Sequence, residues 1–101
     1  MKNSKGKTYT TYILQCSDGS YYTGYARCLE DRVRLHQEGL GAKYTRSRRP
    51  VRVMASWTFP SRSTAMKVEA AIKKCSRHQK EKLIKKKPSP RQMEEDFLQG
   101  S

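Results

Sequence analysis

Two segments with the composition of β-strands lie next to each other near the start of the chain, and they constrain the fold more than any other feature. Both are rich in β-branched and aromatic residues: TYTTYILQC over residues 8–16 and SYYTGYA over residues 20–26. Only Ser17-Asp18-Gly19 separates them. Because Asp-Gly is a strong turn signal between two strand-like segments, the sequence predicts a β-hairpin.

The length of the hairpin loop decides which side chains share a face of the sheet. A two-residue Asp-Gly turn pairs Tyr12 with Tyr25. A three-residue loop that ends in a left-handed Gly19 shifts the register by one residue and pairs Tyr12 with Gly24. Both loops suit the residues, so local rules leave the register open.

Helical and strand patterns alternate along the chain up to residue 84. Apolar residues at helical spacing and a closing Gly39 predict a helix over residues 29–38, and a basic, glycine-bearing loop follows it to Pro50. Residues 51–59 alternate as a strand does. Helical spacing returns over residues 62–75, and a Ser-x-x-Gln capping box at Ser76 begins a last helix that ends near residue 84. The predicted order is β-β-α-β-α-α, an α+β arrangement.

The 101 residues of the chain suffice for one small domain and are too few for a pocket that encloses a large cofactor. We expect this domain over residues 8–84, between a flexible N-terminus (1–7) and a flexible C-terminal tail (85–101) in which proline and charged residues dominate. The sequence has no signal-peptide pattern or long apolar segment, and its three cysteines are isolated. These features predict a cytoplasmic protein, which we expect to be a monomer.

Positive charge dominates the composition, with 22 Lys and Arg against 9 Asp and Glu and a net charge of +13. The last fourteen residues carry −2, so residues 1–87 carry +15. Such a charge destabilises a compact domain by self-repulsion unless solvent or a polyanion screens it. Nucleic acid is the common polyanion of the cytoplasm, so the charge favours nucleic-acid binding over a merely solvated cationic surface. It does not separate DNA from RNA.

One carboxylate stands alone in the basic half of the chain. Between Gly39 and Lys80 there are eleven Lys or Arg residues and a single acid, Glu69. Such a carboxylate is either the centre of local salt bridges or a ligand that holds a divalent cation against phosphate. The residue pattern by itself favours the salt bridge, and it favours ordinary strand aromatics at Tyr12 and Tyr22.

Taken together, these residues form an ordered pattern. Tyr12 is followed by Tyr22-Thr23-Gly24, by Arg32 and His36 one helical turn apart, by the loop Gly41-Ala42-Lys43-Tyr44-Thr45-Arg46, and by Glu69. The pattern resembles the GIY-YIG nuclease domain superfamily, and it is especially similar to the small single-domain bacterial GIY-YIG proteins. In those proteins the GAKYTR loop and the segment that falls here on 72–80 also recur. The resemblance covers roughly residues 8–84.

The resemblance implies a small three-stranded antiparallel sheet flanked by helices. The first motif of the family falls on Thr10-Thr11-Tyr12 and keeps only the tyrosine, and the second falls on Tyr22-Thr23-Gly24 and keeps the tyrosine and the structural Gly24. In family structures both motif tyrosines face the site, and this selects the three-residue hairpin loop.

The resemblance also implies roles for the site residues. The catalytic arginine of the family falls on Arg32, its histidine on His36 and its metal-binding glutamate on Glu69. Glu69 would hold one Mg²⁺ or Mn²⁺ at the scissile phosphate, and Arg32 would neutralise the charge of the transition state. Tyr22 or Tyr12 would take the proton of the attacking water. An unperturbed phenol titrates near about pH 10, so this base needs a lowered pKa or the help of His36, which also fits a hydrogen-bonded core histidine.

Further residues are assigned to contact with the nucleic-acid backbone, which gives affinity but little sequence preference. Trp57 and Phe59, in contrast, are expected in the core rather than stacked on bases. The leading interpretation is a metal-dependent endonuclease that hydrolyses phosphodiester bonds of DNA, structured or branched, with DNA favoured over RNA. The alternative is a GIY-YIG domain that binds DNA or RNA without useful turnover, since Gly-Ile is missing before Tyr12. The assigned contact residues are Lys43, Tyr44, Arg46, Arg48, Arg49, Arg52, Lys73, Lys74 and Arg77.

Overall fold

The computed structural model describes residues 7–98, and these residues form an α+β domain with one three-stranded sheet. The strands are β1 (Tyr9–Gln15), β2 (Tyr21–Ala26) and β3 (Arg52–Phe59). The helices are α1 (Leu29–Gln37), α2 (Lys43–Arg46), α3 (Arg62–Lys73), α4 (Arg77–Lys86) and α5 (Pro90–Leu98). The predicted elements are all present, and α2 and α5 are additional. None of the helices in the described part of the chain is long and apolar enough to cross a membrane.

The β1–β2 hairpin has the three-residue loop that the family resemblance selects. Tyr12 lies opposite Gly24 and Leu14 lies opposite Tyr22 in the antiparallel register. Gly19 closes the loop with φ of +87°, a conformation that glycine adopts without strain. The register therefore places Tyr12 and Tyr22 on the same face of the sheet, two residues apart along the ladder.

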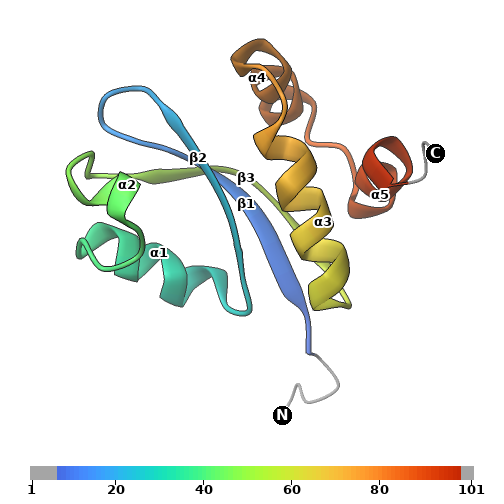
Figure 1. Cartoon of the computed structure of the whole chain (residues 1–101), viewed down its shortest axis with the longest axis horizontal. Helices are drawn as coiled ribbons and strands as arrows, with labels where there is room; N and C mark the ends of the chain where they lie inside the picture. The colour runs from blue at the N-terminus through green and yellow to red at the C-terminus, as the bar shows by residue number, and fades with distance from the viewer. Residues whose placement is uncertain (1–6, 99–101) are drawn as a thin grey trace.

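The sheet has strand order β2-β1-β3 and is antiparallel throughout, as predicted. Figure 1 shows α1 and α2 on one side of the sheet and α3, α4 and α5 on the other. Each face has its own buried cluster. Ile13, Trp57 and Phe59 pack with α3, while Tyr12 and Leu14 pack toward α1. Burial of Trp57 and Phe59 confirms that they belong to the core.

A β-bulge in β3 changes which side chains face each side of the sheet. The register against β1 shifts between Ile13 and Leu14, because Ala55 lies opposite Ile13 and Val53 lies opposite Leu14. Met54 is therefore the extra residue of the bulge. Strand residues an even number of positions apart normally share a face. Because of the bulge, Ala55 instead packs in the cluster beneath α3 and Val51 in the cluster beneath α1.

The prediction of a flexible tail over residues 85–101 is wrong for 85–98, where the structure continues α4 to Lys86 and then forms α5. Met93 of α5 is 0% exposed, and Phe97 one turn later packs on the same cluster as α3. The indole Nε1 of Trp57 also donates a hydrogen bond of 2.8 Å to the carbonyl of Pro88. The tail is acidic on average, but its few apolar residues lie at helical spacing and cover the end of the core. The predicted flexible N-terminus (1–7) lies outside the described residues except for residue 7.

Candidate nuclease site

The two motif tyrosines meet over a glycine. A Cβ atom on Gly24 would lie 2.7 Å from Oη and 2.9 Å from Cζ of Tyr12, and 3.2 Å from Cε2 of Tyr22. These distances leave no room for a larger side chain. Gly24 therefore creates the space in which the Tyr12 phenol sits, which agrees with its expected structural role.

Helix α1 brings His36 against Tyr12. The side chain of His36 is 0% exposed, and its Nε2 atom lies 3.1 Å from Oη of Tyr12. The Nδ1 atom lies 2.8 Å from Oγ1 of Thr45, which itself donates to the carbonyl of Ala42. Because the single hydroxyl proton of Thr45 is used in that way, Nδ1–H of His36 is the donor to Thr45. Nε2 is then unprotonated and accepts the hydroxyl proton of Tyr12.

Thr45 and Gly41 are functional neighbours that the residue pattern did not single out. Thr45 is fully buried and fixes the tautomer of His36. A Cβ atom on Gly41 would lie 2.5 Å from Nδ1 of His36, so the backbone of the loop rests directly on the imidazole ring. Both residues belong to the GAKYTR segment. The recurrence of this segment among similar sequences is the sequence feature that could have pointed to them.

The pKa shifts of Tyr12 and His36 both favour the neutral form of the side chain. Burial, together with the neighbouring Tyr22 phenol, raises the pKa of Tyr12 to about 12, although Arg32 opposes the shift. Burial and the positive charge of Arg32 lower the pKa of His36. A buried phenol and a buried imidazole are both most stable when neutral. Of the two conditions for a tyrosine base, a lowered pKa is therefore not met at Tyr12, whereas a neighbouring base, His36, lies within hydrogen-bonding distance.

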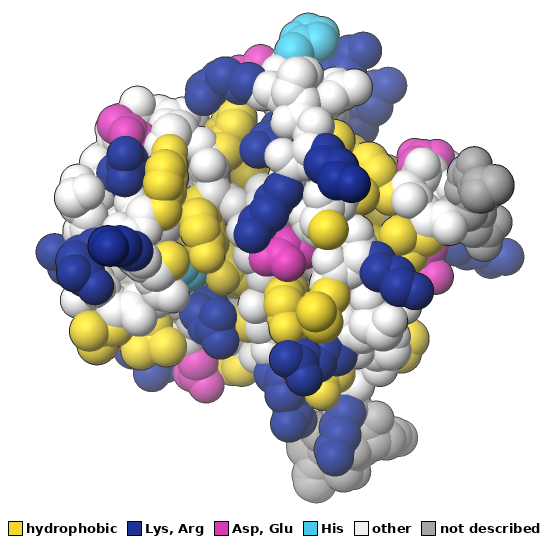
Figure 2. Space-filling model, in the orientation of Figure 1, with side chains coloured by type: hydrophobic (Ala, Val, Ile, Leu, Met, Phe, Trp, Pro, Cys, Tyr) yellow, Lys and Arg dark blue, Asp and Glu magenta, His cyan; other side chains and the backbone are white. Residues whose placement is uncertain are grey.

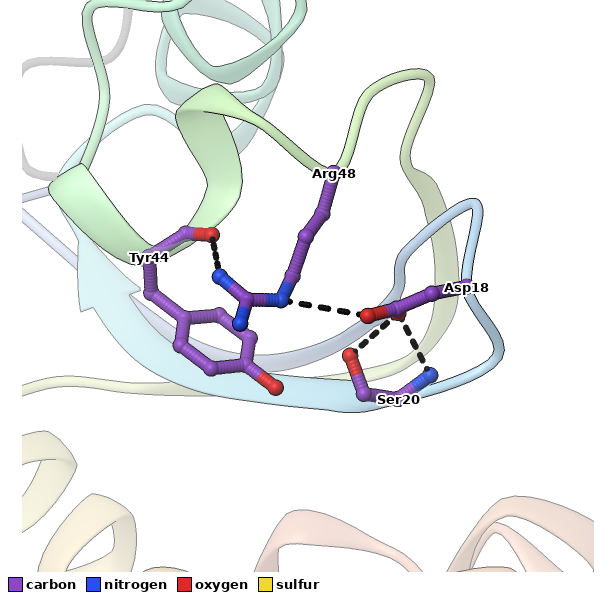
Figure 3. Close-up of polar contacts among 4 residues, drawn as sticks. All are labelled: Asp18, Ser20, Tyr44 and Arg48. Atoms are coloured by element: carbon purple, nitrogen blue, oxygen red, sulfur yellow. Dashed lines mark hydrogen bonds and ion pairs between the residues drawn. The ribbon is translucent and has the colours of Figure 1, made fainter.

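Tyr22 and Tyr44 extend the site toward the surface. The Tyr22 ring contacts His36 edge to face with centroids 5.2 Å apart, and it lies nearly parallel to Tyr44 at 6.1 Å. Tyr44 is held by Arg48, whose guanidinium lies 3.9 Å from the ring centroid and donates to the Tyr44 carbonyl (Figure 3). Arg48 in turn pairs with Asp18 of the hairpin loop at 3.1 Å. Hydrogen bonds from Ser20 lower the pKa of Asp18 and keep this partner ionised.

Glu69 lies on α3, across the edge of the sheet from α1. Its side chain is 18% exposed and forms an ion pair of 3.3 Å with Lys73 one turn later. It is close enough to Tyr12 for its charge to contribute to the raised phenol pKa. The structure thus shows the salt bridge that the residue pattern favours, and it also shows Glu69 near the tyrosines that the family resemblance groups with it.

The donor set tests whether a divalent cation suits this position. No cluster of three or more His, Cys, Asp or Glu side chains occurs within residues 7–98. A cage made entirely of protein ligands is therefore absent from the described residues. Mg²⁺ commonly binds through one or two carboxylates together with water and substrate phosphate. Glu69 supplies one carboxylate of the kind that this mode uses, and in the structure this carboxylate is paired with Lys73.

Arg32 lines a groove of about 520 Å³ that contains two further arginines, Arg27 and Arg62. Aromatic rings hold both of these in place. Nε of Arg62 donates to Oη of Tyr25 at 3.2 Å, and the guanidinium of Arg27 lies 5.8 Å from the ring centroid of Tyr9. The residue pattern gave no signal for Arg27 or Arg62, because they are far apart in the chain and meet only in the folded protein.

Of the nine residues assigned to nucleic-acid contact, Tyr44 is the one aromatic residue and is exposed beside Arg48, and the eight basic residues divide into two groups. Four of them make contacts within the protein: Arg48 with Asp18, Arg49 with the carbonyls of Arg46 and Gln37, Lys73 with Glu69, and Arg77 with Glu81. Side chains of the second group, Lys43, Arg46, Arg52 and Lys74, are exposed. Figure 2 shows basic side chains scattered over the visible face, with hydrophobic side chains and several separate acidic side chains between them. They therefore form a broad basic surface rather than one compact patch.

Comparisons with known proteins agree with this arrangement. The sequence model of the GIY-YIG catalytic domain matches residues 8–90. The UPF0213 protein of Halalkalibacterium halodurans is 49% identical over 79 residues, which cover 78% of this chain and 84% of the relative. A UPF0213 protein of Halobacterium salinarum is 51% identical over 73 residues, covering 72% and 95%.

Two solved structures have the same architecture. The solution NMR structure of the UPF0213 protein from Bacillus halodurans is 43% identical, covers 90% of this chain and 97% of its own, and superposes with a TM-score of 0.54. The solution NMR structure of a protein from E. faecalis is 44% identical, covers 85% and 90%, and gives a TM-score of 0.56. The chain belongs to the GIY-YIG family, a family of nucleases, and is similar along most of its length to the UPF0213 proteins.

Proposed function

We propose that the protein is a metal-dependent endonuclease that hydrolyses phosphodiester bonds of DNA, with structured or branched DNA as its substrate. The observation that supports this most is the buried contact between Tyr12 and His36, which Tyr22 and Arg32 adjoin. A pair of neutral proton-transfer groups beside a guanidinium suits the transfer of a phosphoryl group to water. Membership of the GIY-YIG family supplies the reaction class.

Substrate binding would begin with the basic surface. The net charge of +13 attracts the DNA backbone from a distance, and the groove of Arg27, Arg32 and Arg62 offers three guanidinium groups to adjacent phosphates. Arginine binds phosphate through two parallel hydrogen bonds, which fixes the orientation of the strand. Arg32 would in this way bring the scissile phosphate next to the tyrosines.

Proton removal from the attacking water falls to Tyr22 in this proposal. Tyr22 is partly exposed, whereas Tyr12 is 1% exposed and already donates its proton to His36. A free Tyr12 phenolate is disfavoured by a pKa of about 12. Tyr22 would take that proton only as its own phenol proton passes on to the Tyr12–His36 pair, where Tyr12 would release its proton to Nε2 of His36. His36 would thus be the final proton acceptor, and its burial keeps it out of contact with the substrate.

Arg32 would stabilise the transition state. Extra negative charge develops on the phosphate oxygens during attack, and a guanidinium is always protonated and planar. In other enzymes, removal of one group that stabilises the charge of the transition state lowers the rate by a factor of about 10² to 10³. The same size of loss is expected on removing the Arg32 side chain.

Glu69 is the residue that would hold the metal ion, Mg²⁺ or Mn²⁺. When bound, the ion supplies Lewis-acid stabilisation of the phosphate and of the leaving oxygen. Lys73 must leave the Glu69 carboxylate for this to happen, and its ammonium group then becomes free to contact the DNA backbone.

A nucleic-acid-binding domain without turnover is the second candidate. The observation in its favour is the absence of Gly-Ile before Tyr12. The two residues found there have structural contacts: Thr11 donates to the carbonyl of Ala65 at 2.8 Å, and Thr10 hydrogen-bonds to Thr58. Thr11 faces α3, on the opposite side of the strand from Tyr12, whereas Thr10 lies on the same side as Tyr12 and bonds to Thr58.

The test is cleavage of labelled DNA by the purified protein. Duplex, branched and single-stranded DNA, and the matching RNA, are incubated with Mg²⁺, with Mn²⁺ and with EDTA. We expect metal-dependent cleavage of DNA that Glu69→Gln and Arg32→Ala each reduce about 10²-fold or more. Glu81→Gln is the matched control, because Glu81 also forms an ion pair one turn apart on a neighbouring helix.

The outcomes separate the two candidates. Binding of DNA without cleavage by any metal would replace the nuclease proposal with the binding domain. Cleavage that survives Glu69→Gln would show that Glu69 does not hold the metal. Cleavage of RNA alone would overturn the substrate assignment.

A further inference from the structure

A second hollow adjoins the candidate site, and its lining is unlike that of the arginine groove. It has a volume of about 260 Å³ and is lined by Tyr21, Tyr22, Thr23, Tyr44, Lys73 and Lys80, which we call the tyrosine–lysine cleft. Tyr22 also contacts His36, and Lys73 also pairs with Glu69. The cleft therefore opens directly beside the residues assigned to the reaction.

The charge of the cleft is positive. Lys73 comes from the end of α3 and Lys80 from the first half of α4, and the lining contains no carboxylate. Within the described part of the chain Lys80 forms no ion pair, whereas Lys73 pairs only with Glu69. The ammonium group of Lys80 is thus available to an anionic group such as a phosphate, and that of Lys73 joins it once Lys73 leaves Glu69.

The aromatic side of the cleft is held rigidly before any ligand binds. Tyr22 and Tyr44 lie nearly parallel, with an angle of 22° between the rings, and Tyr44 is 39% exposed. Arg48 covers one side of the Tyr44 ring and is itself tied to Asp18 (Figure 3). This bracing lowers the entropy lost when a flat ligand stacks on the tyrosines.

Thr23 adds an unused polar group. Its hydroxyl is buried and has no hydrogen-bond partner among residues 7–98, although a buried hydroxyl without a partner costs free energy. Thr23 lies on β2 between Tyr22 and Gly24 and is one of the residues that line the cleft.

We propose that the tyrosine–lysine cleft holds one unpaired nucleotide of the DNA substrate, with its phosphate on Lys73 and Lys80 and its base against Tyr22 and Tyr44. The inference rests on the proposed function, because it places this nucleotide beside the phosphate that is cleaved. A volume of about 260 Å³ is just below that of pockets for drug-sized ligands, so it suits one nucleotide rather than several. Stacking tolerates every base, so the cleft selects unpaired strands rather than a sequence.

The experiment measures binding without cleavage. Fluorescence anisotropy in EDTA compares a blunt DNA duplex with the same duplex carrying a short single-stranded extension. The wild-type protein is expected to bind the extended duplex more tightly. Tyr44→Ala should reduce this preference about 5-fold or more, while Tyr44→Phe keeps the ring and the preference.

A lysine pair supplies the matched comparison. Lys80→Ala should lower the slope of log affinity against log salt by about 0.7 for the extended duplex, because one contact to a single-stranded phosphate is lost. Lys85→Ala removes an equal charge from the same helix at a position that does not line the cleft, and it should keep the preference for the extension. Circular dichroism and thermal melting check that each variant is folded.

The inference is overturned if the wild-type protein shows no preference for the extension, or if folded Tyr44→Ala and Lys80→Ala keep the wild-type preference. These results are independent of the cleavage assay. A protein that prefers extended DNA but never cleaves it would retain the cleft and lose the nuclease proposal. A protein that cleaves DNA without this preference would retain the nuclease proposal and lose the cleft.

Discussion

Gly41→Ala is expected to destabilise the protein through the ring of His36. The new Cβ atom would lie 2.5 Å from Nδ1 and 2.6 Å from Cγ of that ring. The ring has little freedom to move, since it is buried and hydrogen-bonded at both nitrogens, to Tyr12 and to Thr45. Gly41 is not one of the glycines with positive φ, so alanine fits the backbone and the cost comes from the contact alone.

The size of the effect follows from that contact. Forcing one extra carbon into a packed site costs about 1–3 kcal/mol. If the ring shifts far enough to break the Tyr12–His36 hydrogen bond, about 1 kcal/mol is added. Each kcal/mol lowers the melting temperature of a domain of this size by about 4–8 °C. A drop of at least about 4 °C is therefore expected for Gly41→Ala.

Thermal unfolding followed by circular dichroism measures this drop, and a double-mutant cycle identifies its cause. In a His36→Ala background the ring is absent, so Gly41→Ala should cost less than about 0.5 kcal/mol. An equal cost in both backgrounds would refute the reasoning, because it would place the strain in the loop and not in the contact with His36.

Three further changes test other parts of the structure. Met93→Ala should lower the free energy of unfolding in urea by about 2–5 kcal/mol, since Met93 is fully buried; a loss below about 0.5 kcal/mol would show that α5 is dispensable. Thr45→Val leaves Nδ1–H of His36 without its acceptor and should cost about 1–3 kcal/mol, and unchanged urea unfolding would contradict the assigned tautomer. The lowered pKa of His36 means that the unfolded chain binds more protons, so the stability that His36 contributes is complete above about pH 6.5 and is lost as the pH falls toward the folded pKa. Melting between about pH 7.5 and pH 5 should show this loss in the wild type and in the control His78→Gln, which changes an exposed histidine, and a smaller loss in His36→Gln.

For the hairpin, the residue pattern predicts the strands but not their register. Composition and the Asp-Gly turn predict both strands, but two registers satisfy the local rules equally. Both faces are buried, so the choice depends on which side chains face α1 and which face α3, and both helices follow later in the chain. The family resemblance carried this information because it keeps both motif tyrosines on one face.

Other features depend on contacts that sequence spacing does not reveal. The alternating apolar residues from Val51 to Phe59 look like one buried stripe. Because of the bulge at Met54, however, Val51 packs in the cluster beneath α1, and Val53 is 40% exposed. Helix α5 was missed because its stability comes from Met93 packing on α3 rather than from its own composition. The groove of Arg27, Arg32 and Arg62 likewise exists only because β2, α1 and α3 meet.

The two buried clusters lie on opposite faces of one sheet that is a single layer thick, and this makes the stability of the site depend on distant parts of the chain. Tyr12 and Ile13 are neighbours on β1, and each belongs to a different cluster. A fluctuation that opens the cluster beneath α3 must release β1, and with it the phenol that contacts His36. The domain is therefore expected to open as one cooperative unit, in which hydrogen exchange is slowest at β1 and in which loosening of α5 is felt at Tyr12.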